Sequence, residues 1–289
     1  TARRVEDAGF STLFMPDHFE DQLAPVPALA AAAAVTSTLR VGSLVFGNDF
    51  RHPVVLAKEM ATIDVLSGGR LELGIGAGWL RTDYDEAGMP YDRPGVRIER
   101  LAESLAIMKG LMSDGPFSFE GEHYSISELD GLPKPHAGVP PIVIGGGGKR
   151  MLTFAAQHAD IVGITANLHT GEVGEDVIDD LSMGDRYDQK VAWVRDAAGD
   201  RDIELSSLTM AGWLVFTDDK ATTAEGVAAR VGVTTERILD TPAVLIGSPG
   251  EIADTLRARR ERWGFSYPVL QTPDDWDSAV AVVSELTGT

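Results

Sequence analysis

An acidic residue and a histidine, Asp17 and His18, directly follow a short apolar segment at residues 11–15. Histidine exchanges protons near neutral pH and can donate a hydrogen bond to a bound molecule. In barrels of parallel strands, the residues that follow a strand lie at the end of the barrel where active sites are built. His18 is therefore a candidate catalytic residue, and a purely structural role is the alternative.

A glycine-rich turn follows another apolar segment. It contains Gly74, Gly76 and Gly78 and runs into Trp79. Glycines at a strand end let a flat ligand approach the backbone closely. The spacing lacks the last glycine of a dinucleotide-binding fingerprint, and no ribose-binding acid follows at the right distance. Taken alone, this turn is weak evidence for a ligand site.

A second turn consists of four consecutive glycines at residues 145–148. It lies between a short apolar strand and a helix, so its amides and the helix N-terminus can hold a phosphate. Lys149 or Arg150 could add a positive charge. The alternative is a flexible turn that binds nothing.

The apolar periodicity predicts strands and helices that alternate along the chain. Helices are expected at residues 1–8, 25–38, 53–66, 94–112, 149–158, 187–198, 223–231, 249–263 and 274–286. Strands are expected at residues 11–15, 40–46, 70–75, 142–144, 160–165, 205–216 and 267–270, with a short apolar segment at 243–246 and a small hairpin at 117–125. The acidic region 167–184 is expected to be either a mobile loop or a surface insertion.

This alternation predicts parallel strand–helix–strand units, and the number of strands favours a (β/α)8 TIM barrel over an open doubly wound sheet. The first expected helix precedes the first expected strand, so we expect that the printed sequence lacks the first strand of the barrel. Because no linker or internal repeat divides the chain, residues 1–289 are expected to form a single domain.

The composition excludes several classes of function. The chain has no cysteine, which rules out disulfides, thiolate metal sites and cysteine nucleophiles. Its formal net charge of −19 repels nucleic acids and anionic membranes, so an anionic cofactor must be held by local groups such as backbone amides. His123, His136 and His158 show no metal-ligand spacing. We expect no metal site, no membrane span and a cytoplasmic location.

Several segments together resemble the luciferase-like monooxygenase superfamily, especially its branch that uses the deazaflavin coenzyme F420. The resemblance rests on residues 8–19, 61–70, 73–79, 140–146 and 245–249, and it runs over nearly the whole chain. It implies a luciferase-like barrel and an oxidoreductase that transfers a hydride between F420 and a small organic substrate. The alternatives are an FMN-dependent monooxygenase of the same superfamily and, in another class, a non-catalytic flavin-binding protein.

The resemblance also implies roles for individual residues. Asp17 and His18 match an Asp–His pair beside the deazaflavin ring, where the histidine is proposed to assist hydride transfer. Leu44 and Val45 match a bulge that contains a non-prolyl cis peptide in relatives and supports the ring from behind. The other expected cofactor contacts are Gly47, Gly76, Gly78, Trp79, Thr82, Gly146, Gly147 and Gly148, of which the last three match the phosphate-binding loop.

The chain departs from the sugar-phosphate dehydrogenases of this branch. Trp79 stands where they carry a catalytic glutamate, and Gln22 stands where they carry a tryptophan. Basic residues that would bind a sugar phosphate are not evident at residues 165–170, so a different substrate is expected. Trp79 predicts an apolar wall of the substrate pocket. Barrels of this family often pair, which implies a homodimer.

Two further expectations concern charged residues. Arg70 is expected to pair with an acidic residue at the bottom of the barrel. Asp83, Asp85 and Glu86 are expected to lie in a solvated loop rather than to bind a metal.

Overall fold

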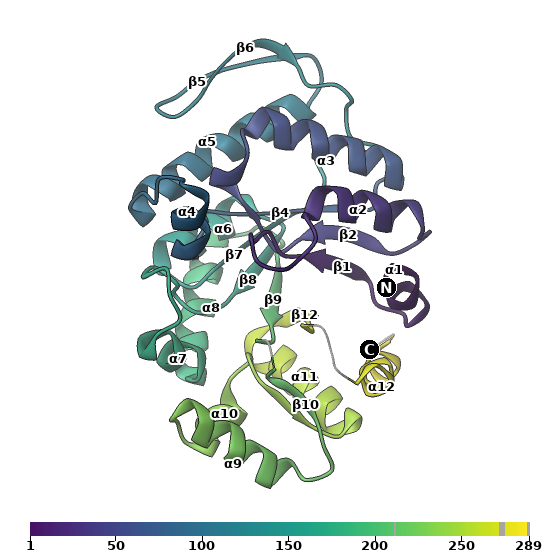
Figure 1. Cartoon of the computed structure of the whole chain (residues 1–289), viewed down its shortest axis with the longest axis vertical. Helices are drawn as coiled ribbons and strands as arrows, with labels where there is room; N and C mark the ends of the chain where they lie inside the picture. Colours follow the sequence, from purple (N-terminus) through teal and green to yellow (C-terminus); the bar gives the residue numbers. More distant parts are fainter. Residues whose placement is uncertain (211, 272–274, 288–289) are drawn as a thin grey trace. The chain divides into compact units, whose positions relative to one another are not determined.

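The computed structural model describes residues 1–210, 212–271 and 275–287. They form two compact units, Thr1–Ile144 and Gly145–Thr289. Strands and helices alternate in both units, as the sequence predicts (Figure 1). The expectation that residues 1–289 form a single domain stays a prediction.

The first unit is built on a sheet of parallel strands. They lie side by side in the order β1 (Thr12–Met15), β2 (Arg40–Ser43), β4 (Leu71–Gly76) and β7 (Ile142–Gly146). Every residue of β4 is buried, because β4 pairs with a neighbour on each side. The strand expected at 40–46 is broken, and its end forms the short strand β3 (Phe46–Gly47), which also pairs with β4.

Helices connect these strands. They are α1 (Ala2–Asp7), α2 (Pro25–Ala34), α3 (Pro53–Ser67), α4 (Arg81–Ala87) and α5 (Pro94–Met112), with a 3-10 turn η1 (Asn48–Phe50) before α3. A proline begins α2, α3 and α5, because its fixed φ suits the first helical turn and its missing N–H is not needed there. The prediction for α5 is confirmed at both ends, whereas the short and mostly polar α4 is not predicted by the apolar pattern.

A hairpin of strands β5 (Pro116–Glu120) and β6 (Ser125–Asp130) follows α5 and extends beyond it (Figure 1). It is longer than the hairpin expected at residues 117–125. Glu103 on α5 holds the turn of this hairpin, because its carboxylate accepts three consecutive backbone N–H groups at residues 122–124.

Arg70, which directly precedes β4, does not make the expected ion pair. Its guanidinium donates to the carbonyl oxygens of Ala33, Thr36, Leu39 and Ser67 and to the Thr36 hydroxyl. Among the described residues, no acidic side chain bonds to it. The expectation is therefore wrong, and the reason is that helix ends leave carbonyl groups without partners, which a guanidinium can satisfy.

In the second unit, the end of β7 is followed by three strands that run parallel in the order β8 (Ile161–Ile164), β9 (Glu204–Leu208) and β12 (Phe265–Val269). A separate two-stranded parallel sheet contains β10 (Leu214–Phe216) and β11 (Leu245–Gly247). The single strand expected at 205–216 is thus wrong. It is two strands with different partners, and Gly212, at a φ of 71°, turns the chain between them.

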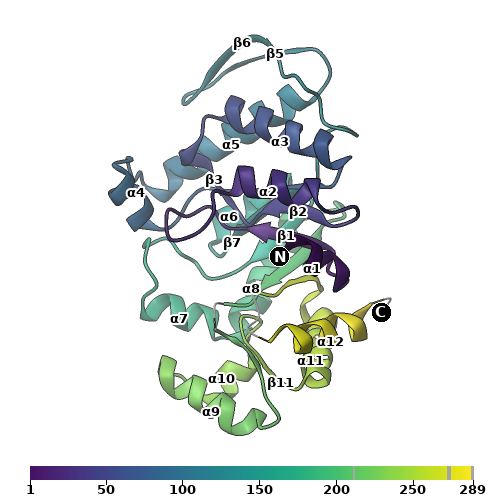
Figure 2. The same cartoon turned by 45° about the vertical axis from the view of Figure 1, so that its right-hand side comes forward.

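The helices of this unit are α6 (Lys149–His158), α7 (Glu175–Leu181), α8 (Gly184–Ala198), α9 (Lys220–Val231), α10 (Thr235–Asp240), α11 (Pro249–Trp263) and α12 (Trp276–Leu286). The bounds expected for α6 and α11 are confirmed. Figure 2 shows α9 and α10 side by side in this unit, and they pack on each other. The region 167–184 is not wholly a loop, because it contains α7, whose Val177 and Leu181 are buried.

In the described part of the chain, no helix is both long enough and apolar enough to cross a membrane.

Candidate active site

His18 forms a close hydrogen bond with Asp83. His18 follows β1, Asp83 lies on α4, and 2.6 Å separates His18 Nδ1 from Asp83 Oδ2. The Asp83 side chain is 5% exposed and that of His18 is 25% exposed. Because a carboxylate accepts a proton-bearing nitrogen, this bond places a proton on Nδ1. Proton exchange with a bound molecule therefore falls to Nε2.

The second carboxylate oxygen of Asp83 is also occupied. It accepts the backbone N–H of Phe19 at 3.2 Å. The turn that carries His18 is held from its other side by Gln22, whose amide donates to the carbonyl oxygens of Pro16 and His18. The histidine is thus fixed through its ring and through its backbone.

The expectation that Asp83 lies in a solvated loop is wrong. Asp85 and Glu86 are exposed as expected, but Asp83 is buried against His18. The error follows from missing α4, because this helix turns Asp83 and Tyr84 inward and leaves Asp85 and Glu86 exposed. No local signal separates Asp83 from Asp85, because both are next to Tyr84 in the sequence.

Asp17 has partners of a different kind. Its carboxylate makes two bonds to the Arg51 guanidinium, at 2.6 and 3.0 Å, and accepts the N–H of Gly47 at 3.0 Å. Asp17 is 6% exposed, so its carboxylate is shielded from water, whereas the Arg51 side chain is 21% exposed. This geometry gives Asp17 and Gly47 the role of fixing the loop after β2. No local pattern in the sequence marks Arg51 as the partner of Asp17.

The Leu44–Val45 peptide bond is cis, and it separates β2 from β3. Two glycines of β4 make room for this bulge. A Cβ atom on Gly74 would lie 1.7 Å from the Ser43 carbonyl oxygen, and one on Gly76 would lie 2.7 Å from Val45 Cγ2. The glycines therefore leave room for the bulge between β2 and β3, which is a structural reason for their presence.

Trp79 stands next to His18. The two ring centroids are 5.8 Å apart and nearly perpendicular. Trp79 is held by its own carbonyl oxygen, which accepts the Tyr91 hydroxyl at 2.8 Å. Gly78, at a φ of 75°, allows this turn, and a Cβ atom there would lie 1.9 Å from the Tyr84 hydroxyl.

Tyr84 secures α4 beneath these residues. It is fully buried, and its hydroxyl donates to Asp49 Oδ2 at 3.1 Å. Burial, together with the negative charge of Asp49, raises the pKa of Tyr84, so the hydroxyl keeps its proton. Thr82, which also belongs to α4, is exposed, and the geometry of the first unit gives it no bond to the His18 group.

In the second unit, Gly146, Gly147 and Gly148 end β7 and lead into α6, whose N-cap is Gly148. No side chain of the described residues caps this helix end. The N–H groups of a first helical turn have no partner within the helix and attract anions. This loop can therefore bind a phosphate, and Lys149 and Arg150, both exposed, flank it.

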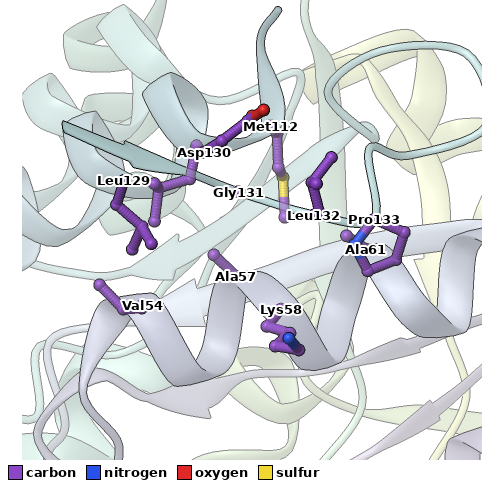
Figure 3. A pocket seen from close by; sticks show the side chains of 11 residues that line it. Val54, Ala57, Lys58, Ala61, Met112, Leu129, Asp130, Gly131, Leu132 and Pro133 are labelled. Carbon is purple, nitrogen blue, oxygen red and sulfur yellow. The ribbon is translucent and has the colours of Figure 1, made fainter. Parts of the chain in front are cut away.

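The first unit also contains a hollow of about 150 Å³. Figure 3 shows Val54, Ala57 and Lys58 of α3 across from Leu132 and Pro133, which follow β6. None of the expected site residues lines it. Most of the residues that line the hollow are apolar, and Lys58 and Asp130 are its charged lining residues.

Known proteins resemble this chain at the levels of both sequence and fold. The model of the luciferase-like monooxygenase family matches residues 1–267. An F420-dependent glucose-6-phosphate dehydrogenase of Amycolatopsis mediterranei is 29% identical over 167 residues, which cover 55% of this chain and 50% of that protein. The chain spans about half the length of the F420-dependent dehydrogenases that it matches.

Solved structures share the fold. The F420-dependent tetrahydromethanopterin reductase of Methanopyrus kandleri matches with a TM-score of 0.77 and 21% identity, over 98% of this chain and 93% of that one. The FMN complex of the oxygenating constituent of 3,6-diketocamphane monooxygenase from Pseudomonas putida matches with a TM-score of 0.72 and 17% identity, over 99% and 90%. The predicted α/β fold of luciferase-like (β/α)8 type is confirmed, and the chain belongs to the luciferase-like monooxygenase family.

Proposed function

We propose that this chain is an oxidoreductase that transfers a hydride between coenzyme F420 and a small organic substrate. The observation that carries the proposal is the bond between His18 and Asp83 beside the Trp79 ring. It supplies an oriented proton donor or acceptor next to an apolar surface, which is what hydride transfer at a flat ring requires.

The residues present suit a flavin-like cofactor. The glycine loop at 146–148 precedes a helix end that no described side chain caps, so backbone amides are available for a phosphate despite the net charge of −19. The cis bulge at Leu44 and Val45 offers a half-buried apolar surface for the ring. When bound, the deazaflavin supplies the hydride chemistry.

Each group of this chain then has one task. His18 gives or takes the accompanying proton at Nε2, because Nδ1 is committed to Asp83. Asp83 orients the imidazole, and Asp17 with Arg51 fixes the loop that carries Gly47. Trp79 provides an apolar wall that excludes water from the reacting atoms.

The substrate proposed is neutral and apolar rather than a sugar phosphate. Trp79 occupies the place where sugar-phosphate dehydrogenases of the family carry an acid. Two exposed apolar side chains, Phe19 at 52% and Leu23 at 70%, lie on the same loop as His18. Exposed apolar residues next to a candidate catalytic group favour an apolar ligand.

FMN-dependent oxygenation is the second candidate. It is favoured by the fold shared with the FMN complex of the diketocamphane enzyme, whereas F420 is favoured by the named activity of the sequence relatives. A titration of the apoprotein with F420 and, separately, with FMN, followed by fluorescence quenching, separates the two. Tighter binding of F420 is the expected result, and a clear preference for FMN would overturn it.

A non-catalytic flavin-binding protein is the remaining alternative. In that case His18→Ala would change only cofactor affinity, and no substrate would turn over in a screen with reduced F420. If the chain is the proposed enzyme, substrate should turn over and His18→Ala should abolish this turnover.

We also propose a homodimer. Multi-angle light scattering tests it, and a monodisperse monomer would refute it.

A further inference from the structure

Lys190, in the second unit, is a buried lysine that the proposed chemistry does not use. It lies on α8, and its side chain is 3% exposed. Its Nζ donates to Asp180 Oδ2 at 2.6 Å and to the Thr165 carbonyl oxygen at 2.8 Å. The Asp180 side chain is 19% exposed, so Lys190 is the buried member of the pair, and these two oxygens replace the water that its ammonium group loses.

This pair holds a short stretch of backbone from two directions. Thr165 directly follows β8, and its carbonyl is bound by Lys190. Asp180 on α7 also accepts the N–H of Asn167 at 2.8 Å. The residues on both sides of Ala166 are thus tied to one ion pair, and Ala166 itself is 2% exposed.

The same stretch is the surface on which the glycine loop rests. The Thr165 N–H donates to the Gly146 carbonyl oxygen at 3.0 Å. A Cβ atom on Gly147 would lie 2.1 Å from the Ala166 carbonyl oxygen, and one on Gly148 would lie 3.1 Å from Asn167 Oδ1. The loop backbone and the 165–167 backbone therefore touch, so a displacement of one shifts the other.

We propose that Lys190 and Asp180 are positioning residues that hold the 165–167 backbone against the glycine loop and so set its affinity for a phosphate. The inference rests on the proposed function in one respect, namely that Gly146, Gly147 and Gly148 bind the cofactor phosphate. It adds that an ion pair between α7 and α8, outside the glycine loop itself, controls that affinity.

The test compares ligands that differ in the phosphate. FMN is measured against riboflavin, and F420 against its phosphate-free chromophore, by fluorescence titration of the full chain. The variant Lys190→Met/Asp180→Leu replaces the ion pair by apolar side chains, a change that often preserves stability. We expect FMN and F420 to bind about tenfold more weakly, a coupling of the usual size, and the phosphate-free ligands to bind unchanged.

Two further variants keep the test decisive. Arg259→Met is the matched control, because Arg259 is also a buried cation of this unit, 5% exposed, but it bonds the carbonyls of Thr241, Pro242 and Val244 instead. It should leave the preference for FMN over riboflavin intact. Asp180→Asn keeps the shape of the side chain but removes its charge. The same titrations are made with this variant if the double variant does not fold.

Hydrogen exchange adds a readout that needs no cofactor. The amides of residues 145–149 and 165–167 should exchange faster in the Lys190 and Asp180 variants than in the wild-type protein or in Arg259→Met. Equal weakening of all four ligands, or the same loss of preference in Arg259→Met, would overturn the positioning role. A wild-type protein that does not distinguish FMN from riboflavin would instead refute the phosphate-binding loop, and with it the inference built upon that loop.

Discussion

Asp83 and His18 are 65 residues apart in the chain, yet 2.6 Å separates Asp83 Oδ2 from His18 Nδ1. The carboxylate is buried and its other oxygen binds the Phe19 N–H, so it cannot rotate away without losing both bonds. A histidine held in this way presents one nitrogen to its partner and leaves the other for chemistry.

The first prediction concerns the tautomer of His18. Neutral His18 should carry its proton on Nδ1, because Asp83 accepts that proton. Nitrogen-15 NMR of histidine-labelled protein distinguishes the two tautomers. Asp83→Asn should produce a mixture of tautomers, whereas Asp85→Asn, an exposed residue of the same helix, should change nothing. A wild-type signal from the Nε2–H tautomer would contradict the geometry.

The second prediction concerns turnover. His18→Asn removes the proton donor or acceptor and should lower kcat at least about a hundredfold, the usual contribution of acid–base catalysis. Asp83→Asn should lower it about tenfold to a hundredfold, because the imidazole loses its orienting partner. The assay is the absorbance change of F420 with a substrate found in the screen. Unchanged cofactor affinity in both variants would separate catalysis from binding, and an unchanged kcat would argue against the proposed role.

The third prediction concerns the bulge at Leu44 and Val45. A methyl group added at Gly76 would meet Val45 Cγ2 at 2.7 Å, so Gly76→Ala should lower the free energy of unfolding by about 1–3 kcal/mol. Gly226, inside α9, has nothing within 4 Å of the added atom. Gly226→Ala should therefore raise the free energy of unfolding by about 0.5–1 kcal/mol. Urea denaturation measures both, and equal effects of the two substitutions would refute the close approach.

The fourth prediction concerns acid stability. Glu6 accepts the backbone N–H groups of Thr38, Leu39 and Ser37, and these bonds lower its pKa from 4.5 to about 2. Because the folded pKa lies below the unfolded one, the stabilisation is complete above about pH 4.5 and is lost as the pH falls toward 2. Glu6→Gln should remove this part of the pH dependence.

The measurement for Glu6 is the thermal midpoint between pH 2 and pH 6. The wild-type protein should lose more stability than Glu6→Gln as the pH falls through this range. Asp7→Asn, at an exposed position of the same helix, serves as the control and should follow the wild-type curve. Parallel curves for wild type and Glu6→Gln would show that the carboxylate does not cap this turn.

Much of the fold follows from local sequence. The bounds of α5, α6 and α11 are predicted to the residue, because proline or glycine marks their starts and apolar periodicity marks their length. The order of strands and helices is also local information, and it suffices for the fold class. The position of His18 after β1 follows in the same way.

Other features depend on residues that are distant in sequence. Periodicity cannot place the short helix α4, so it cannot show that Asp83 turns inward to His18. Nor can it divide residues 205–216 into β9 and β10, because strand partners decide that division. The carbonyl groups around Arg70 are assembled only when α2 and the loop before β4 meet.

The sequence by itself determined the alternating α/β pattern, the candidate histidine and the glycine turns, since each depends on neighbours within a few positions. Only the tertiary structure decided their partners: Asp83 for His18, Arg51 for Asp17, and Lys190 with Asp180 for the stretch beside the glycine loop. The physical reason is that a hydrogen bond or ion pair requires two groups within about 3 Å of each other. The number of residues between two groups in the sequence does not determine that distance, which is set only when the chain has folded.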